Sequence, residues 1–177
     1  MPDHPPTPHP QPDAPPAASL DSTTLRHALG RFATGVTVIT CTAADGHRVG
    51  LTANSFQSLS LQPPLVMWAL RCSSGNLAAF LAAPAFAVNV LAQDQVALSQ
   101  HFASRSTDKF AMGDWQTGQV GAPVLAGCTA VFECTVHSHQ TVGDHVLFIG
   151  EVRHLAEADR APLLFQGGQY RSVGPAI

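Results

Sequence analysis

Short apolar runs separated by glycine and proline constrain the fold of this chain more than any other feature. The runs are rich in Val, Ile, Thr and Leu, and turn residues such as Asp45-Gly46 and Pro63-Pro64 lie between them. β-Branched residues favour strands, whereas Gly, Pro and Asp favour turns. We expect strands over residues 36–42, 48–53, 65–70, 85–91, 124–139 and 145–154, and a hairpin over 163–173. Many short strands with few helices predict a mainly β protein, a closed antiparallel barrel.

A few short helices are expected around these strands. Asp21 or Ser22 can cap a helix that ends near Gly35 and places four apolar residues on one face: Leu25, Ala28, Leu29 and Phe32. Ser73 or Ser74 can cap a second helix that stops before Pro84, and residues 94–102 favour a third. Residues 104–122 are expected to be irregular, with Phe110, Met112 and Trp115 packed against the barrel. The continuously apolar run 65–70 is typical of a strand buried on both faces.

Composition limits the class of protein. The 177 residues predict one domain over residues 20–177. Eight of the fourteen prolines lie in residues 1–19, which are expected to form a disordered tail. Charged residues are only 12% of the chain, about half the usual share. So few charges favour a buried subunit interface, and we expect a homodimer. A net charge of −3 gives no basic surface for nucleic acid.

The cysteines and the absence of targeting signals indicate the compartment. Cys41, Cys72, Cys128 and Cys134 form no C-x-x-C pair, which favours free, buried thiols in a reducing compartment. No apolar run reaches the length of a membrane span. The N-terminus lacks the basic start and apolar core of a secretion signal, so the sequence predicts a cytoplasmic protein without membrane contact.

Small polar side chains crowd one short segment. Thr52, Asn54, Ser55, Ser58 and Ser60 lie within nine residues, just before Pro63-Pro64. Hydroxyls and an amide can hydrogen-bond a flat heterocycle or a phosphate without filling its pocket. The same composition is also usual in surface loops, and Ser58 and Ser60 alternate with leucines as on a solvated strand face. Both interpretations remain open from composition alone.

Several motifs together resemble a known family. Gly-Leu-Thr-Ala-Asn-Ser-Phe at residues 50–56 is followed by Ser-Leu-Ser-Leu-Gln-Pro-Pro-Leu at 58–65. Arg-Phe-Ala-Thr-Gly-Val-Thr-Val precedes them, and Phe-Ala-Val-Asn-Val-Leu, Gly-Asp-His and Gly-Glu-Val follow in order. This series is similar to the short-chain flavin reductases, which are reductase components of two-component flavin monooxygenases. The resemblance covers about residues 22–173 and implies an FMN-binding split β-barrel with a few short peripheral helices.

The resemblance also implies an activity and a site. The expected activity is an NAD(P)H:flavin oxidoreductase that transfers a hydride from NADH or NADPH to FMN or FAD and supplies a partner monooxygenase with reduced flavin. Cofactors carry this chemistry, so no catalytic side chain is expected. The residues implied to hold the flavin are Thr52, Ala53, Asn54, Ser55, Ser58, Arg71, Ser73, Ser74, Asn76, Phe102 and Ala103. Of these, the residues 71–76 form a cluster that can bind phosphate at a helix start.

Two further residues are implied to contact NAD(P)H. His145, in Gly-Asp-His, is placed beside the nicotinamide, and Tyr170 could close over it. His145 could otherwise be a surface residue of a turn, and Tyr170 an ordinary strand residue. Recognition of a 2′-phosphate would require a cation, and Arg48, Arg71, Arg105 and Arg171 are candidates. His137 and His139 are two apart on one expected strand but lack further ligands, so no metal site is expected.

Other functions stay open. A flavin-bound reductase of a ferric chelate or a corrinoid is one alternative, and a non-catalytic flavin- or haem-binding split-barrel module is another. The sequence has no G-x-G-x-x-G motif after a strand and no G-x-S-x-G motif. It therefore gives no support for a Rossmann dinucleotide domain or a serine hydrolase.

Overall fold

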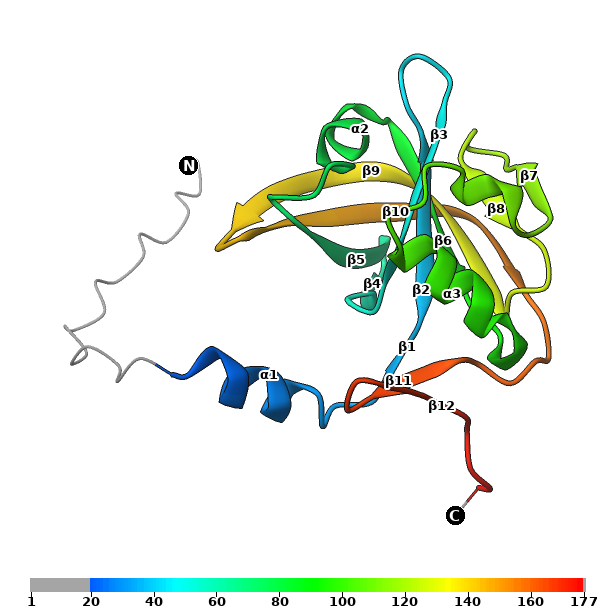
Figure 1. Ribbon diagram of the computed structural model, residues 1–177. Coiled ribbons are helices and arrows are strands. Elements are labelled where there is room, and N and C mark those ends of the chain that lie inside the picture. The colour runs from blue at the N-terminus through cyan, green and yellow to red at the C-terminus, as the bar shows by residue number, and fades with distance from the viewer. Residues whose placement is uncertain (1–19, 177) are drawn as a thin grey trace, which may run out of the picture.

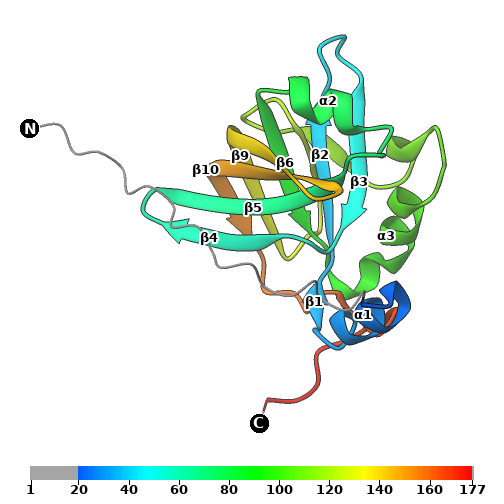
Figure 2. The same ribbon diagram turned by 90° about the vertical axis from the view of Figure 1, so that its left-hand side faces the viewer.

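A single curved antiparallel sheet dominates the computed structural model, which describes residues 20–176. Its seven strands follow the order β3-β2-β6-β9-β10-β5-β4. These strands are β2 (Thr37–Thr42), β3 (Arg48–Ala53), β4 (Gln57–Leu61), β5 (Pro64–Arg71), β6 (Ala85–Val90), β9 (Ala130–Val142) and β10 (His145–Glu157). Strands β4, β5 and β10 run across β2, β3 and β6, so the sheet wraps around its own core (Figure 2). The prediction of a mainly β protein is confirmed.

The barrel is split rather than closed. Strands β3 and β4 are the two edges of the hydrogen-bonded order, so no ladder joins them within residues 20–176. The closed barrel expected from the strand pattern alone is therefore wrong, whereas the split β-barrel implied by the family resemblance is confirmed. The physical reason lies in the connection: the chain turns at residues 54–56 and leaves β3 to pair β4 with β5 on the far side of the sheet. The opening exposes main-chain groups at the end of β3.

Shorter elements surround the sheet (Figure 1). The remaining strands are β1 (Thr34–Gly35), β7 (Trp115–Thr117), β8 (Pro123–Leu125), β11 (Leu164–Gln166) and β12 (Gln169–Arg171). The helices are α1 (Ser22–Leu29), α2 (Leu77–Ala82) and α3 (Val96–Ala103), with single 3-10 turns η1 (Gln93–Gln95) and η2 (Lys109–Ala111). Strands β1, β11 and β12 form a small sheet beside α1, and β7 pairs with β8. The proline-rich tail, residues 1–19, lies outside the described residues.

Several expected boundaries need correction. Helix α1 begins at the Asp21 cap, as expected, but ends at Leu29 because Gly30 closes its last turn. Helix α2 begins after Asn76, and neither Ser73 nor Ser74 caps it. The expected strand 124–139 is broken into β8 and β9, and β7 forms in a segment expected to be irregular. Phe110 and Trp115 pack against Phe102, whereas Met112 is 38% exposed.

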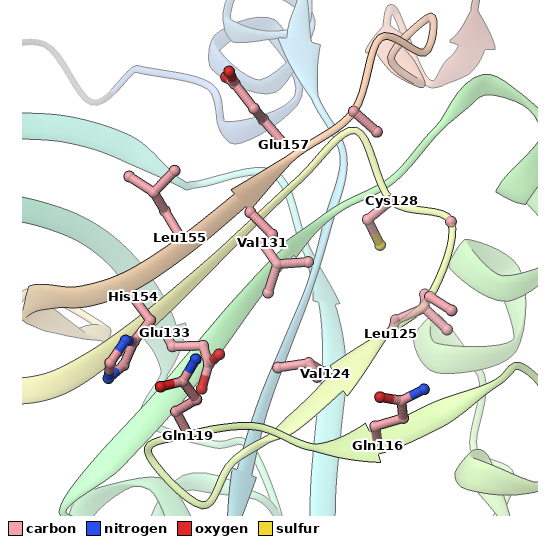
Figure 3. Close-up of a pocket in the computed structure, with 14 residues that line it drawn as sticks. Gln116, Gln119, Val124, Leu125, Cys128, Val131, Glu133, His154, Leu155 and Glu157 are labelled. Atoms are coloured by element: carbon pink, nitrogen blue, oxygen red, sulfur yellow. The ribbon is translucent and has the colours of Figure 1, made fainter.

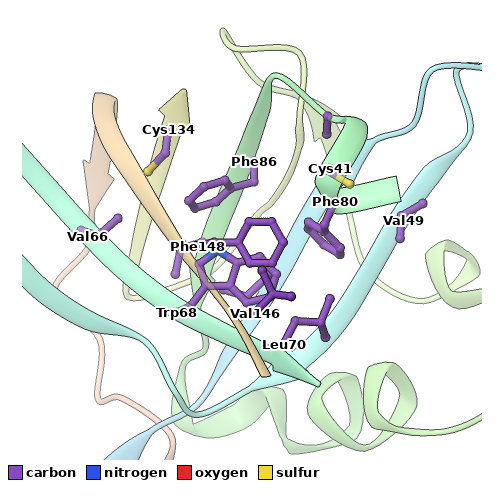
Figure 4. Close-up of a cluster of buried hydrophobic side chains, with 13 residues drawn as sticks. Cys41, Val49, Val66, Trp68, Leu70, Phe80, Phe86, Cys134, Val146 and Phe148 are labelled. Carbon is purple, nitrogen blue, oxygen red and sulfur yellow. The ribbon is translucent and has the colours of Figure 1, made fainter. Parts of the chain in front are cut away.

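Aromatic rings fill the centre of the barrel (Figure 4). Trp68 is fully buried and stacks on Phe148 with ring centroids 4.7 Å apart, while Phe80 and Phe86 meet its edges. A second cluster lies between the sheet and α3 and contains Val36, Val38, Leu91, Phe102, Leu125, Cys128 and Leu163. Strand β5 alternates, with Val66, Trp68 and Leu70 buried and its other face partly exposed. The expectation that this strand is buried on both faces is wrong, because Leu65, Met67 and Ala69 on its second face are only partly buried.

Three of the four thiols are buried in these clusters. Burial raises the pKa of Cys41, Cys128 and Cys134 to about 12, which keeps each sulfur protonated. Cys72 is exposed, contrary to the expectation for all four, because it follows the last residue of β5 and lies at the surface. All four are free cysteines, as expected.

Gly150 has a packing role that gives one testable prediction. A Cβ atom at this position would lie 2.9 Å from Cys134 Cβ and closer still to the ring of Phe86. We expect Gly150→Ala to lower the free energy of unfolding by about 1–3 kcal/mol through overpacking. Gly75→Ala is the matched control, because a Cβ there meets nothing within 4 Å. Equal urea midpoints for the two variants would contradict this role.

Candidate functional site

A cavity of about 740 Å³ lies where the barrel is split. The ends of β3 and β5, the loop after β5 and the residues after α3 surround it, and the first residue of β10 completes it. Its lining consists of Leu51, Thr52, Ala53, Asn54, Ser55, Ala69, Leu70, Arg71, Ser73, Ser74, Ala103, Arg105 and His145. The volume falls in the range of small-molecule and cofactor pockets.

Ser55 holds the segment after β3 against β5. Its hydroxyl accepts a hydrogen bond from the Ala69 N–H at 3.0 Å and donates one to the Ala69 carbonyl at 3.1 Å. The ladder between β4 and β5 reaches only from Leu61 to Gln57, so Ala69 has no β4 partner. A side chain therefore replaces the missing strand and satisfies main-chain groups beside the cavity. The Ser55 hydroxyl therefore has a structural role beside the cavity.

Thr52 connects the cavity to α3. Its hydroxyl donates to the Ser99 carbonyl at 2.7 Å, and the Ser99 hydroxyl shares a 2.9 Å hydrogen bond with the Tyr170 hydroxyl. Ser99 is fully buried, so these bonds are shielded from water. The C-terminal hairpin β11–β12 is thus connected to the end of β3 through Tyr170, Ser99 and Thr52. Tyr170 packs on Phe165 in this position and does not line the cavity.

Other polar groups remain free to meet a ligand. Asn54 is exposed and its side chain makes no hydrogen bond within residues 20–176. Ser73 is likewise exposed at the cavity, whereas the Ser74 hydroxyl accepts from the Asn76 N–H at 3.3 Å. An amide, a hydroxyl and unpaired edge N–H groups can together bond the carbonyl and nitrogen edge of a flat heterocycle.

Two of the four candidate cations belong to this site. Arg71 and Arg105 line the cavity and form no ion pair within the described part of the chain. Arg48 lies instead over the Phe110 ring, 4.9 Å from its centroid, and Arg171 lines a different cavity. Two guanidinium groups in a cleft whose lining contains no carboxylate suit a phosphate.

His145 stands at the mouth of the cavity. It is the first residue of β10 and pairs with Arg71 across the ladder to β5. Its Nδ1 lies 2.7 Å from the Asp144 carboxylate, and this hydrogen bond holds the pKa of Asp144 below its usual range. The contact fixes Nδ1 and leaves Nε2 to face a ligand.

The structure brings together most of the residues expected at the site. Thr52, Ala53, Asn54, Ser55, Arg71, Ser73, Ser74, Ala103 and His145 all line the cavity. Three other expected residues do not line the cavity. Ser58 lies on the exposed β4 edge, Asn76 precedes α2, and Phe102 packs in the core against Gly50. The lining residues Leu51, Ala69 and Leu70 were not expected, because nothing in an apolar run marks the face that borders the split.

A smaller hollow of about 320 Å³ lies between β7–β8 and β9–β10 (Figure 3). Glu133 and His154 lie at one end of it and Leu125 and Cys128 at the other. The Glu133 carboxylate accepts from the Val120 N–H at 3.0 Å, so it holds the loop before β8. None of the expected site residues lines this hollow.

Neither a cluster of metal ligands nor a membrane-spanning helix occurs in the described part of the chain. No group of three possible metal ligands occurs among residues 20–176, and His137 and His139 are both exposed. None of the described helices has the length and apolar character needed to cross a bilayer.

The fold and cavity together define a split β-barrel protein with a polar cleft of cofactor size at the split, whose lining contains two arginines and no carboxylate. Comparison with known proteins agrees with this class. Residues 29–174 match the family model described as flavin reductase like domain. The chain belongs to this family.

Named relatives are similar over most of the chain. The FMN reductase (NADH) of Agrobacterium fabrum is 44% identical, and the alignment covers 85% of each protein. The reductase subunit of a flavin-dependent monooxygenase from Rhodococcus jostii is 42% identical over 90% of this chain and 82% of its own. The NADH:FAD oxidoreductase of Streptomyces globisporus, solved with NAD and FAD fragments, has a TM-score of 0.84 at 40% identity and covers 92% of this chain and 98% of its own.

Proposed function

We propose that this protein is an NAD(P)H-dependent flavin reductase that supplies reduced FMN or FAD to a partner monooxygenase. The observation that carries the proposal is the cavity at the split, where a neutral polar segment, two arginines and one histidine converge. The names of the relatives support the activity, and two of them specify NADH. A flavin bound there would supply the hydride acceptor for the nicotinamide, and this chemistry would need no side-chain acid or base.

The cavity residues bind and orient the reactants. Asn54, Ser73 and the backbone of Thr52, Ala53 and Ser55 bond the polar edge of the ring. Arg71 and Arg105 bind the flavin phosphate. Because the Ser55 bond to Ala69 fixes the segment, these donors hold the ring in one orientation while its charge changes on reduction.

His145 is proposed to position the nicotinamide through Nε2. We expect His145→Ala to raise the KM for NADH by about tenfold, the loss of one hydrogen bond to a polar group, with little change in the KM for flavin. Steady-state kinetics with each substrate varied in turn measures this difference. His139→Ala is the control, because that exposed histidine lies away from the cavity. An unchanged KM for NADH would rule out the role.

The activity itself has a direct test. Purified protein is mixed with NADH or NADPH and with FMN or FAD, and the loss of nicotinamide absorbance is followed. Rapid oxidation that depends on added flavin is expected, and the four pairings identify the preferred reactants. Flavin binding without oxidation in any pairing would contradict the proposal.

A homodimer is proposed as the working form. Leu25 and Leu29 on α1 and Phe32 just after it are 44%, 66% and 66% exposed, and Leu61 at the β4 edge is 93% exposed. Such apolar surface in a chain with 12% charged residues is suited to a subunit interface. Sedimentation equilibrium would show twice the chain mass, and a monomer at micromolar concentration would contradict the proposal.

A further inference from the structure

A second cavity, of about 560 Å³, lies between α1 and the β11–β12 hairpin. It is on the other face of the hairpin from the flavin cleft. Tyr170 points toward Ser99, whereas its neighbours Gln169 and Arg171 line the second cavity, as the alternation of side chains in a strand requires. The two cavities share no lining residue.

Helix α1 turns its polar face toward this cavity. Thr23 lies three residues before Arg26 and four before His27, which places the three on one face, and all three line the cavity together with the C-cap Gly30. Leu25 and Leu29 do not line the cavity and are also exposed. An ordinary surface helix buries its apolar face, whereas α1 has no buried residue. Its arginine-bearing face therefore borders an open cavity between two elements.

The cavity concentrates positive charge. Arg26, Arg31 and Arg171 line it together with His27, and no carboxylate is among the lining residues. None of the three arginines forms an ion pair within residues 20–176, whereas Arg153 and Arg160 are each paired with an acid. Three of the nine lysines and arginines of an overall acidic chain thus meet in one place.

The helix dipole explains only part of this cluster. Cations in the last turn of a helix interact favourably with its C-terminal end, which accounts for Arg26 and His27. Arg31 lies beyond the helix end, and Arg171 comes from a strand more than a hundred residues later in the sequence. The helix dipole therefore does not explain why Arg31 and Arg171 line the same cavity.

We propose that this cavity binds the diphosphate group of a nucleotide. Arginine binds phosphate oxygens in bidentate pairs, and three guanidinium groups match the charge of a diphosphate. Gln169 and Thr23 provide neutral groups for a sugar or base, and the Gly167-Gly168 turn leaves open space, because a Cβ at either glycine meets nothing within 4 Å. The site goes beyond the proposed reductase activity and does not depend on it.

ADP and inorganic pyrophosphate are suitable probes, with binding to the full chain measured by calorimetry. We expect both to bind, and the double variant Arg31→Gln/Arg171→Gln to bind about 100-fold more weakly. The matched control is Arg153→Gln/Arg160→Gln, which removes the same charge from exposed ion pairs and should bind ADP within about twofold of wild type. Circular dichroism checks the fold, and Arg26→Gln on the exposed helix is a second, milder variant.

Kinetics then shows whether the site is separate from the flavin cleft. The double variant should leave the KM values for FAD and FMN unchanged while ADP binding is lost, because Arg71 and Arg105 are proposed to bind the flavin phosphate in the other cavity. A raised KM for either flavin would contradict a separate nucleotide site. Failure of wild type to bind ADP and pyrophosphate, or equal binding by the double variant, would overturn it whether or not the protein oxidises NADH.

Discussion

Replacing Asn54 with tryptophan is expected to weaken flavin binding by about 100-fold, or about 2.7 kcal/mol, while the fold stays intact. Asn54 lines the cleft, is exposed and makes no side-chain hydrogen bond within the described chain. A large ring at this position would occupy the space proposed for the isoalloxazine and remove a free amide. Fluorescence titration with FMN and FAD measures the dissociation constant directly.

The choice of Asn54 over Ser55 follows from the structure. Ser55 bonds both main-chain groups of Ala69, so a bulky residue there would disturb β5 as well as the cleft. Gln57→Trp is the matched control, because Gln57 is exposed on β4 and outside the cavity lining. Flavin affinity that is normal in Asn54→Trp, or reduced equally in Gln57→Trp, would remove the segment after β3 from the site.

Trp68→Ala is expected to have the largest effect on stability. Trp68 is fully buried and contacts Phe80, Phe86 and Phe148 with ring centroids 4.7–5.8 Å apart. Removal of a buried aromatic side chain costs about 3–5 kcal/mol of unfolding free energy, a large share of the 5–15 kcal/mol typical of a domain. Denaturation in urea, followed by circular dichroism, should show a much lower midpoint.

Val142→Ala provides the comparison. Val142 is 56% exposed near the end of β9, and its truncation should change the unfolding free energy by less than about 0.5 kcal/mol. A Trp68→Ala midpoint close to that of Val142→Ala would mean that the aromatic cluster does not form the core.

The sequence predicted the strands of this fold better than their pairing. Apolar runs gave β2, β3, β5 and β6 nearly residue by residue, since local composition determines strand propensity. The split could not be predicted from composition, because it depends on which strand β4 joins after the turn at residues 54–56. For the same reason, nothing marked Ala69 as a cavity residue.

At the site, motifs identified the segment but not what each atom does. Thr52 and Ser55 stand in a polar motif, yet their hydroxyls bond the Ser99 and Ala69 main chains. Asn89, within another motif, is buried and bonds Val38 and Leu125 of neighbouring strands. Hydroxyls and amides bond protein or ligand equally well, so only the fold distinguishes these uses.

The Ser55 bridge to Ala69 has a further consequence for how a ligand is bound. The segment of four small residues at the edge of the sheet, Thr52, Ala53, Asn54 and Ser55, would ordinarily lose about 1–2 kcal/mol of conformational entropy per residue on becoming ordered. Here the hydroxyl orders it during folding, with no ligand required. Association with a preorganised site avoids that loss and a slow rearrangement, so flavin can enter and leave in single, fast steps. Rapid exchange is what a carrier of reduced flavin between two proteins needs.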